Sequence, residues 1–179
     1  MSRKVLVISS SLRRGSNTEM LADEFLKGAA SAGHSAEKLG LAGKTINFCI
    51  GCLACQQTKR CVIDDDSREI TEKMLNADVI AFATPVYYYS VCGQLKTVLD
   101  RANPLFVSDY KFRDIYLLAA AAEDEPETVQ GTETAVQGWV SCFPKAALKR
   151  TIFAGGVNDA GDIKGHRALK EAYEAGKQL

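Results

Sequence analysis

The sequence predicts an α/β fold in which helices cover both faces of a five-stranded, doubly wound parallel sheet. Short runs rich in β-branched residues alternate with amphipathic segments of helical length, which is the pattern of βαβ units. The run at 78–83 is apolar after its first residue, as expected of a strand that is buried on both faces. This alternation continues to the end of the chain, so we expect one sheet.

The individual elements follow from apolar periodicity and from turn residues. Strands are predicted at 4–9, 34–39, 78–83, 114–120 and 150–154. Helices are predicted at 17–32, from 66 or 67 to 77, and at 91–101, 127–143 and 166–177. Gly33 is a natural stop for the first helix, Asp66 or Ser67 can cap the second, and Pro85 is expected to end the third strand.

Length, charge and hydropathy limit the classes of function. The 179 residues, 46% of them hydrophobic, are enough for one packed core, and we expect a single domain over 1–179. Lys plus Arg and Asp plus Glu number 22 each, so the net charge favours no nucleic-acid partner. No apolar run approaches the roughly 20 residues that cross a bilayer. The chain enters a strand at once, without a secretory signal, so we expect a cytoplasmic protein.

Four cysteines lie in the segment 40–66, which is longer than the usual structureless connection. Cys49, Cys52, Cys55 and Cys61 have the spacing C-x2-C-x2-C-x5-C, and three thiols at intervals of three can converge on an iron-sulfur cluster. Zinc fits less well, because structural zinc sites usually pair two C-x-x-C units. Disulfides are disfavoured in a cytosolic chain. The alternative to a [4Fe-4S] cluster is four reduced thiols on a loop.

The loop after the first strand has the residues of a phosphate site. Ser11, Ser16 and Thr18 offer hydroxyls, Asn17 offers an amide, and Arg13 offers a guanidinium next to the free N–H groups of a helix start. The alternative is that Ser16 merely caps the helix together with a glutamate three residues later. Neither the dinucleotide G-x-G-x-x-G pattern nor a nucleotide P-loop ending is present, so a mononucleotide fits better.

The turn after the third strand can hold a planar ring. Backbone groups near Val86 and Tyr87 can bond the polar edge of a flavin while a tyrosine packs against its face, and the loop after the fourth strand would close the pocket. The residues assigned to this pocket are Pro85, Val86, Tyr87, Tyr88, Ala121 and Glu123. The alternative is that the tyrosines are core or dimer-interface residues.

Other residues are expected to be structural. Cys92 and Cys142 fall in predicted helices, and free cysteine is among the most buried residue types, so we expect both in the core. The aspartates at 64–66 are expected to cap the following helix rather than to bind a metal.

Four motifs together resemble the NADPH-dependent FMN reductase family of flavodoxin-like proteins, over nearly the whole chain. They are SSLRRGSNT at 10–18, CIGCLAC at 49–55 with CVIDDD at 61–66, TPVYY at 84–88, and QLKTVLDR at 94–101. The cysteine spacing is similar to that of the iron-sulfur flavoproteins in this family. The family's phosphate loop is usually Gly-Ser-Pro-Arg-x-x-Gly-Asn-Thr, and Ser10, Leu12 and Ser16 depart from it.

The resemblance implies a flavodoxin-like strand order 2-1-3-4-5 and an FMN-binding homodimer or dimer of dimers that is reduced by NADH or NADPH. The leading hypothesis is an FMN-dependent NAD(P)H oxidoreductase with a quinone, a flavin or another small molecule as acceptor, in which the flavin rather than a protein residue carries the chemistry. One alternative is an iron-sulfur flavoprotein that exchanges single electrons with a ferredoxin-like protein through a [4Fe-4S] cluster. Another is a non-enzymatic flavodoxin-type carrier.

Overall fold

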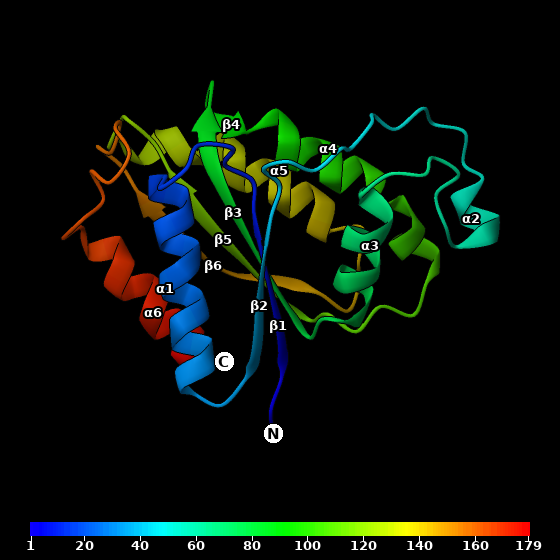
Figure 1. Cartoon of the computed structure of the whole chain (residues 1–179), viewed down its shortest axis with the longest axis horizontal. Helices are drawn as coiled ribbons and strands as arrows, with labels where there is room; N and C mark the ends of the chain where they lie inside the picture. Colours follow the sequence, from blue (N-terminus) through cyan, green and yellow to red (C-terminus); the bar gives the residue numbers. More distant parts are fainter.

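The computed structural model describes all 179 residues and has the doubly wound α/β fold that the sequence predicts (Figure 1). Its parallel strands are β1 (Lys4–Ser9), β2 (Ser35–Gly40), β3 (Val79–Tyr87), β5 (Asp114–Ala120) and β6 (Ala147–Ala154). They are ordered β2-β1-β3-β5-β6, which is the predicted 2-1-3-4-5 order. A sixth strand, β4 (Ser90–Val91), pairs antiparallel with the end of β3.

Helices cover both faces of the sheet. The helices are α1 (Asn17–Ser31), α2 (Cys55–Thr58), α3 (Ser67–Asn76), α4 (Gly93–Arg101), α5 (Gln130–Val140) and α6 (Arg167–Lys177), with 3-10 turns η1 (Asn103–Val107) and η2 (Pro126–Val129). In Figure 1, α1 and α6 lie together on one side of the sheet, and α3, α4 and α5 lie on the other. No helix combines the length and the apolar character needed to cross a bilayer.

Two apolar clusters, one on each face, explain the continuous apolar runs of the strands. In β1, Val5 and Val7 belong to the cluster beneath α1 and α6, whereas Leu6 and Ile8 belong to the cluster beneath α3, α4 and α5. Because successive side chains of a strand point to opposite faces, a strand covered on both faces needs apolar residues at every position. This burial fixes the sheet as the centre of the fold.

Helices α1 and α6 approach each other closely at two glycines. A Cβ atom on Gly28 would lie 2.0 Å from the carbonyl oxygen of Tyr173, and one on Gly176 would lie 2.1 Å from that of Phe25. Any larger residue at either position would push the helices apart. The pair of helices therefore forms a rigid layer behind the loop that follows β1.

The structure corrects several predicted boundaries. Strand β3 continues through Pro85 to Tyr87, because its end pairs with β4 in a hairpin. The helix predicted at 127–143 is divided into η2 and the shorter α5, and the long segment 40–66 contains the single helical turn α2. Cys142 follows α5 and is exposed, so its assignment to the core was wrong, whereas Cys92 is fully buried at the start of α4.

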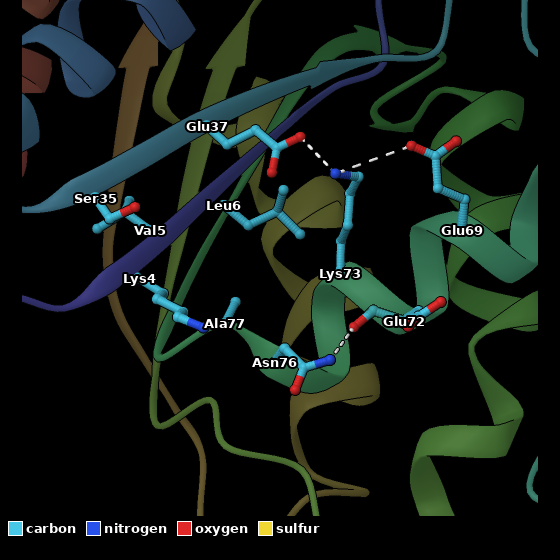
Figure 2. Close-up of a pocket in the computed structure, with 10 residues that line it drawn as sticks. All are labelled: Lys4, Val5, Leu6, Ser35, Glu37, Glu69, Glu72, Lys73, Asn76 and Ala77. Atoms are coloured by element: carbon cyan, nitrogen blue, oxygen red, sulfur yellow. Dashed lines mark hydrogen bonds and ion pairs between the residues drawn. The ribbon is translucent and has the colours of Figure 1, made fainter.

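One hollow of the surface lies between α3 and the first halves of β1 and β2, and Figure 2 shows its lining. The Nζ atom of Lys73 lies 2.6 Å from Glu37 Oε1 and 3.9 Å from Glu69 Oε1. The charge of Lys73 is thus neutralised by two glutamates of the same hollow, which is lined by the amino halves of both strands. Ligands of doubly wound folds bind at the opposite, carboxyl ends.

Candidate functional site

The loops at the carboxyl ends of β1, β3, β5 and β6 contact one another at a single edge of the sheet. The chain passes from β1 to β2 on one side and then crosses over to β3 on the other, so the topological switch point lies between β1 and β3. Ligand sites of open α/β sheets lie in the crevice at such a point.

The start of α1 is capped and still offers free backbone donors. The Ser16 hydroxyl accepts a hydrogen bond from the N–H of Glu19 at 3.1 Å, and the Glu19 carboxylate accepts one from the N–H of Gly15 at 3.2 Å. The cap that the sequence predicted is thus formed. The N–H groups of Ser16, Asn17 and Thr18 bond no protein acceptor. These donors, at the positive end of a 15-residue helix, are suited to an anion.

Arg13 lies at the outer side of this loop. Its guanidinium donates to the carbonyl oxygen of Asn158 at 2.8 Å and lies 3.6 Å from Asp159 Oδ1, while the side chain remains about half exposed. The hydroxyl of Ser11 accepts from the N–H of Arg13 at 3.3 Å. The guanidinium is consequently held against the β6–α6 loop, with its exposed part available to a ligand.

The side chain of Asn17 bonds the backbone of the β6–α6 loop, a structural role that the sequence did not indicate. Its Nδ2 donates to the carbonyl oxygen of Asp159 at 2.9 Å, and its Oδ1 accepts from the N–H groups of Gly161 and Ile163 at 3.0 and 3.2 Å. The side chain is buried. It therefore ties the β6–α6 loop to the start of α1, and only its backbone N–H stays free for a ligand.

A second buried contact fixes the beginning of the same loop. The Ser10 hydroxyl donates to the carbonyl oxygen of Ala83 at 2.8 Å, and the Cys92 thiol donates to the Ser10 hydroxyl at 3.2 Å. Ser10 stands where the family pattern has glycine, which has no hydroxyl. The hydroxyl at this position therefore links the end of β1 to β3 and to the start of α4.

The tyrosine segment forms a two-residue hairpin turn between β3 and β4. Tyr88 and Tyr89 both have left-handed backbone conformations, with φ of 49° and 59°. Such a turn has the right twist for a hairpin, but aromatic residues adopt it rarely and under strain. The side chains of Tyr87 and Tyr88 are exposed, that of Tyr88 completely, so neither is a core residue.

Contacts with α5 and with the loop after β5 hold this hairpin. A Cβ atom on Gly131 would lie 2.1 Å from the carbonyl oxygen of Tyr89, so α5 touches the strained turn directly. The Tyr89 hydroxyl donates to Glu123 Oε2 at 2.7 Å. This hydrogen bond, together with the negative charge of Glu123, raises the pKa of Tyr89.

The loop after β5 joins the hairpin to the loop after β6. The N–H of Ala121 bonds the carbonyl oxygen of Ala154, and the carbonyl oxygen of Ala121 accepts from the N–H of Val157. A Cβ on Gly155 would lie 2.3 Å from Asp124 Oδ1. The loops after β1, β6, β5 and β3 are therefore connected in one series of contacts. The residues predicted to bind FMN lie on the β1–α1 loop and the first turn of α1, at the end of β3 and in its hairpin turn, and on the loop after β5.

The four predicted metal ligands lie elsewhere. Cys49, Cys52, Cys55 and Cys61 line one small hollow whose other walls are mainly apolar. No three of the protein's His, Cys, Asp or Glu side chains converge tightly enough to hold one metal ion. Each cysteine of a [4Fe-4S] cluster binds a different iron, so the ligands lie farther apart than those of a zinc ion, and four thiols around an apolar hollow suit the cluster.

This cysteine hollow is remote from the first loop. In Figure 1, α2 with the cysteine segment lies at the right end of the molecule, whereas the β1–α1 loop lies on the left above α1. One chain therefore presents two separate candidate sites.

A buried arginine supports the cysteine hollow. Arg101, at the end of α4, is 2% exposed. Its Nη1 and Nη2 atoms lie 2.8 and 3.0 Å from the two carboxylate oxygens of Asp65, and Nη2 also lies 3.3 Å from Cys61 Sγ. Its Nη1 donates to the carbonyl oxygen of Asn47 at 2.6 Å. The Nε–H of this guanidinium is buried and has no hydrogen-bond partner.

The same contacts determine the ionisation of Asp65. Burial works against its charged form, but the hydrogen bonds from Arg101 and from the N–H groups of Asn47 and Ser67 outweigh it and hold its pKa well below the usual range. Asp65 also accepts from the N–H of Ser67 at the start of α3. Asp66 occupies the N-cap position but its side chain bonds no N–H of the helix, so the predicted cap by Asp66 or Ser67 was wrong and the aspartate one position earlier takes this role. The sequence analysis did not predict the ion pair between Asp65 and Arg101.

Asn103 provides a second contact to the cysteines. Asn103 is the first residue of η1, and its Nδ2 donates to Cys55 Sγ at 3.1 Å.

The sequence contains a pattern from which the buried ion pair of Arg101 could have been predicted, but none that points to Asn103. Leu95, Val98 and Ala102 form the apolar face of α4, and Arg101 lies three residues after Val98, on that face. A charge there requires a buried partner.

Comparison with known proteins agrees with this architecture. Residues 3–136 match the family model of the NADPH-dependent FMN reductases. An iron-sulfur flavoprotein of Methanocaldococcus jannaschii is 44% identical over 102 residues, which is 57% of this chain and 53% of that protein. An iron-sulfur flavoprotein of Methanosarcina thermophila is 38% identical over 99 residues, 55% of this chain and 52% of that protein. The chain spans about half the length of these relatives.

A third relative matches at full length. A Bacillus subtilis protein named as an NAD(P)H-dependent FMN-containing oxidoreductase is 29% identical over 179 positions, which cover 94% of each chain. Among solved structures, the NAD(P)H:quinone oxidoreductase of Methanothermobacter marburgensis superposes with a TM-score of 0.80 at 19% identity, covering 100% of this chain and 96% of that one. At a sequence identity of 19%, this structural similarity shows the fold alone.

The architecture is that of the flavodoxin-like α/β proteins. The match of the family model over three quarters of the sequence identifies the family as well as the fold. The chain belongs to the NADPH-dependent FMN reductase family.

Proposed function

We propose that this protein is an FMN-dependent NAD(P)H oxidoreductase that passes reducing equivalents to a quinone, a flavin or another small acceptor. The observation that carries the proposal is the connected series of loops at the carboxyl edge of the sheet, with free N–H donors at the start of α1. FMN bound there would accept hydride from NAD(P)H and pass two electrons to the acceptor. The relatives' names support the cofactor and the reductant.

The residues of the first loop fit a phosphate monoester. In this proposal the N–H groups of Ser16, Asn17 and Thr18 and the guanidinium of Arg13 bind the phosphate, and the hydroxyls of Ser11 and Thr18 supply further donors. Dianionic phosphate attracts these groups by charge-assisted hydrogen bonds and by the helix dipole. The buried side chain of Asn17 contributes by holding the loop in shape.

The hairpin and the loop after β5 are the proposed ring site. Backbone groups near Pro85, Val86 and Tyr87 would meet the polar edge of the ring, with Tyr87 or Tyr88 against its face. Ala121 and Glu123 would border the ring from the neighbouring loop. The complete exposure of Tyr88 also supports a homodimer or a dimer of dimers in which a second subunit covers this tyrosine.

Replacing Arg13 tests the phosphate assignment. Arg13→Ala should weaken FMN binding by about 1.5 to 3 kcal/mol, as expected for a lost hydrogen bond to a charged group, and adding Ser11→Ala should weaken it further. Fluorescence titration of FMN and FAD measures both affinities. Arg14→Ala is the matched control, because Arg14 is the exposed neighbouring arginine. Equal FMN affinity in the wild type and the double variant, or binding of FAD alone, would refute the assignment.

A second candidate function is single-electron exchange with a ferredoxin-like protein through a [4Fe-4S] cluster. Its specific support is the common hollow of Cys49, Cys52, Cys55 and Cys61, and the presence of donors at two of their sulfurs. The names of the iron-sulfur flavoproteins agree with it. In this case a cluster held in the cysteine hollow would exchange electrons with the partner protein, and FMN would bind at the carboxyl edge of the sheet.

Iron content tests the second candidate. Serine at any of the four cysteine positions should lower iron and acid-labile sulfide in anaerobic preparations while FMN remains bound, because the two sites are separate. Cys142→Ser, at an exposed cysteine outside the hollow, is the control. Quinone reduction by NAD(P)H should persist in these variants. Wild-type protein that takes up no iron and sulfide on reconstitution excludes the second candidate and leaves the first.

A further inference from the structure

We propose that Arg101 and Asn103 are positioning residues for the cysteine hollow, which hold the sulfurs of Cys61 and Cys55 and raise the reduction potential of an iron-sulfur cluster bound there. This inference rests on the second candidate function above. It concerns residues outside the cysteine motif, in the α4–η1 segment.

Both contacts are direct. The Arg101 Nη2 lies 3.3 Å from Cys61 Sγ, and the Asn103 Nδ2 lies 3.1 Å from Cys55 Sγ. Two of the four predicted ligands thus receive an N–H donor from the same short segment. The other two, Cys49 and Cys52, are exposed.

The Arg101 donor is held in a fixed position by its other partners. Arg101 is 2% exposed, and its guanidinium is fixed by Asp65 and by the carbonyl oxygen of Asn47. Asn103 lies between the buried residues Ala102 and Pro104 at the start of η1. A donor in a fixed position stabilises an anionic sulfur without losing side-chain entropy when the charge develops.

The chemistry of a thiolate-bound cluster gives the direction of the effect. One-electron reduction adds a negative charge that is shared with the cysteine sulfurs, and hydrogen bonds to the sulfurs favour that more negative form. Hydrogen bonds to charged acceptors are roughly twice as strong as neutral ones. Donors at Cys55 and Cys61 therefore favour the reduced cluster, and their removal should lower its potential.

Asn103 is the better residue for the test, because a change at Arg101 leaves Asp65 buried without its partner. Asn103→Leu removes the donor and keeps the branching of the side chain at Cγ. Asn103→Asp replaces the donor with a carboxylate that repels the sulfur. Asn76→Asp is the control for added charge, since Asn76 lies at the end of α3 in the hollow of Figure 2.

The readout is the midpoint potential of the cluster, measured by redox titration with electron paramagnetic resonance. We expect Asn103→Leu to shift the equilibrium toward the oxidised cluster by about threefold and Asn103→Asp by about tenfold, which corresponds to about 28 and 59 mV for one electron. The potential of the flavin should not change in either variant. A role in folding alone would lower the melting temperature without moving the cluster potential.

The possible failures are distinguishable. Cluster potentials in both Asn103 variants equal to that of Asn76→Asp would overturn the inference and leave the cluster itself in place. Reconstitution of the wild type without uptake of iron would overturn the inference together with the cluster. Neither result affects the proposal that FMN binds at the carboxyl edge.

Discussion

Arg101 and Asp65 form a two-point ion pair whose side chains are 1% and 3% exposed, and this pair attaches the end of α4 to the segment that carries the cysteines. The two residues are 36 positions apart in the sequence, and each also bonds the backbone of the segment 47–67. The pair therefore sets the position of Cys61 relative to the rest of the fold.

Asp65→Asn should destabilise the protein strongly. The variant leaves the Arg101 guanidinium buried without its counter-charge, and breaking one half of a buried ion pair costs about 3 to 5 kcal/mol. Urea denaturation at pH 7 measures the loss. Asp64→Asn is the control, because Asp64 is 84% exposed and pairs with Arg68 at the surface, where the effect should stay below about 0.5 kcal/mol. Equal losses in the two variants would contradict the role of the pair.

The contribution of Asp65 should also depend on pH. Because its pKa is lower in the folded protein than in the unfolded chain, its carboxylate stabilises the fold fully above the unfolded pKa of about 4, and the contribution declines as the pH falls toward the folded pKa. The difference in unfolding free energy between the wild type and Asp65→Asn should therefore be constant from pH 6 to 7 and shrink below about pH 4. A difference that grows with acidification would contradict this assignment.

Gly131→Ala should lower stability although alanine is the better helix former. The new Cβ would lie 2.1 Å from the Tyr89 carbonyl oxygen and would displace the hairpin, at an expected cost of about 1 to 3 kcal/mol. Gly138→Ala in the same helix meets no atom within 4 Å and should stabilise by about 0.5 to 1 kcal/mol. Thermal unfolding of both variants gives the comparison. Stabilisation by Gly131→Ala would show that the hairpin yields easily.

Glu123→Gln should lower the pKa of Tyr89 toward its ordinary value. The glutamine oxygen can still accept the hydrogen bond, but the negative charge that opposes ionisation of the phenol is gone. Carbon-13 resonances of labelled tyrosine, with Tyr89→Phe for assignment, follow the titration. Glu127→Gln, an exposed change on η2, should leave the pKa unaltered. An unchanged pKa in Glu123→Gln would mean that the hydroxyl faces solvent instead.

Asn17→Ala should loosen the β6–α6 loop as well as weaken the binding of FMN. Three hydrogen bonds to backbone groups of residues 159–163 disappear, and buried groups left unpaired cost about 1 to 3 kcal/mol each. Hydrogen exchange of the Gly161 and Ile163 amides reports the loosening in protein without FMN. Protection equal to that of the wild type would show that the side chain does not hold the loop.

The sheet was predictable because burial on both faces leaves a continuous apolar run in each inner strand. The 78–83 run and the 114–120 run needed no long-range information, and their order followed from the family resemblance. The extension of β3 beyond Pro85 was not predictable in this way, because it depends on a hairpin in which two tyrosines adopt a conformation usually left to glycine or asparagine.

The candidate sites were predictable where local sequence supplies the chemistry. The first loop and the cysteine motif can be recognised from their residue types alone. By contrast, the side-chain hydrogen bonds of Asn17, Cys92 and Arg101 join residues that lie between 36 and 146 positions apart in the sequence. Such pairings arise only when the sheet brings distant loops together. The buried position of Arg101 on an apolar helix face was the one local sign of them.

The two outer strands restrict how copies of this protein can associate. Lys38 of β2 lies 2.5 Å from Asp23 and Glu37 pairs with Lys73, while Lys149 and Arg150 of β6 pair with Asp114 and Glu171. A neighbouring strand that approached either border would lie beside these charges, and charged borders oppose the growth of one sheet onto another. An assembly that formed through helices and loops instead would leave the sheet at its own width.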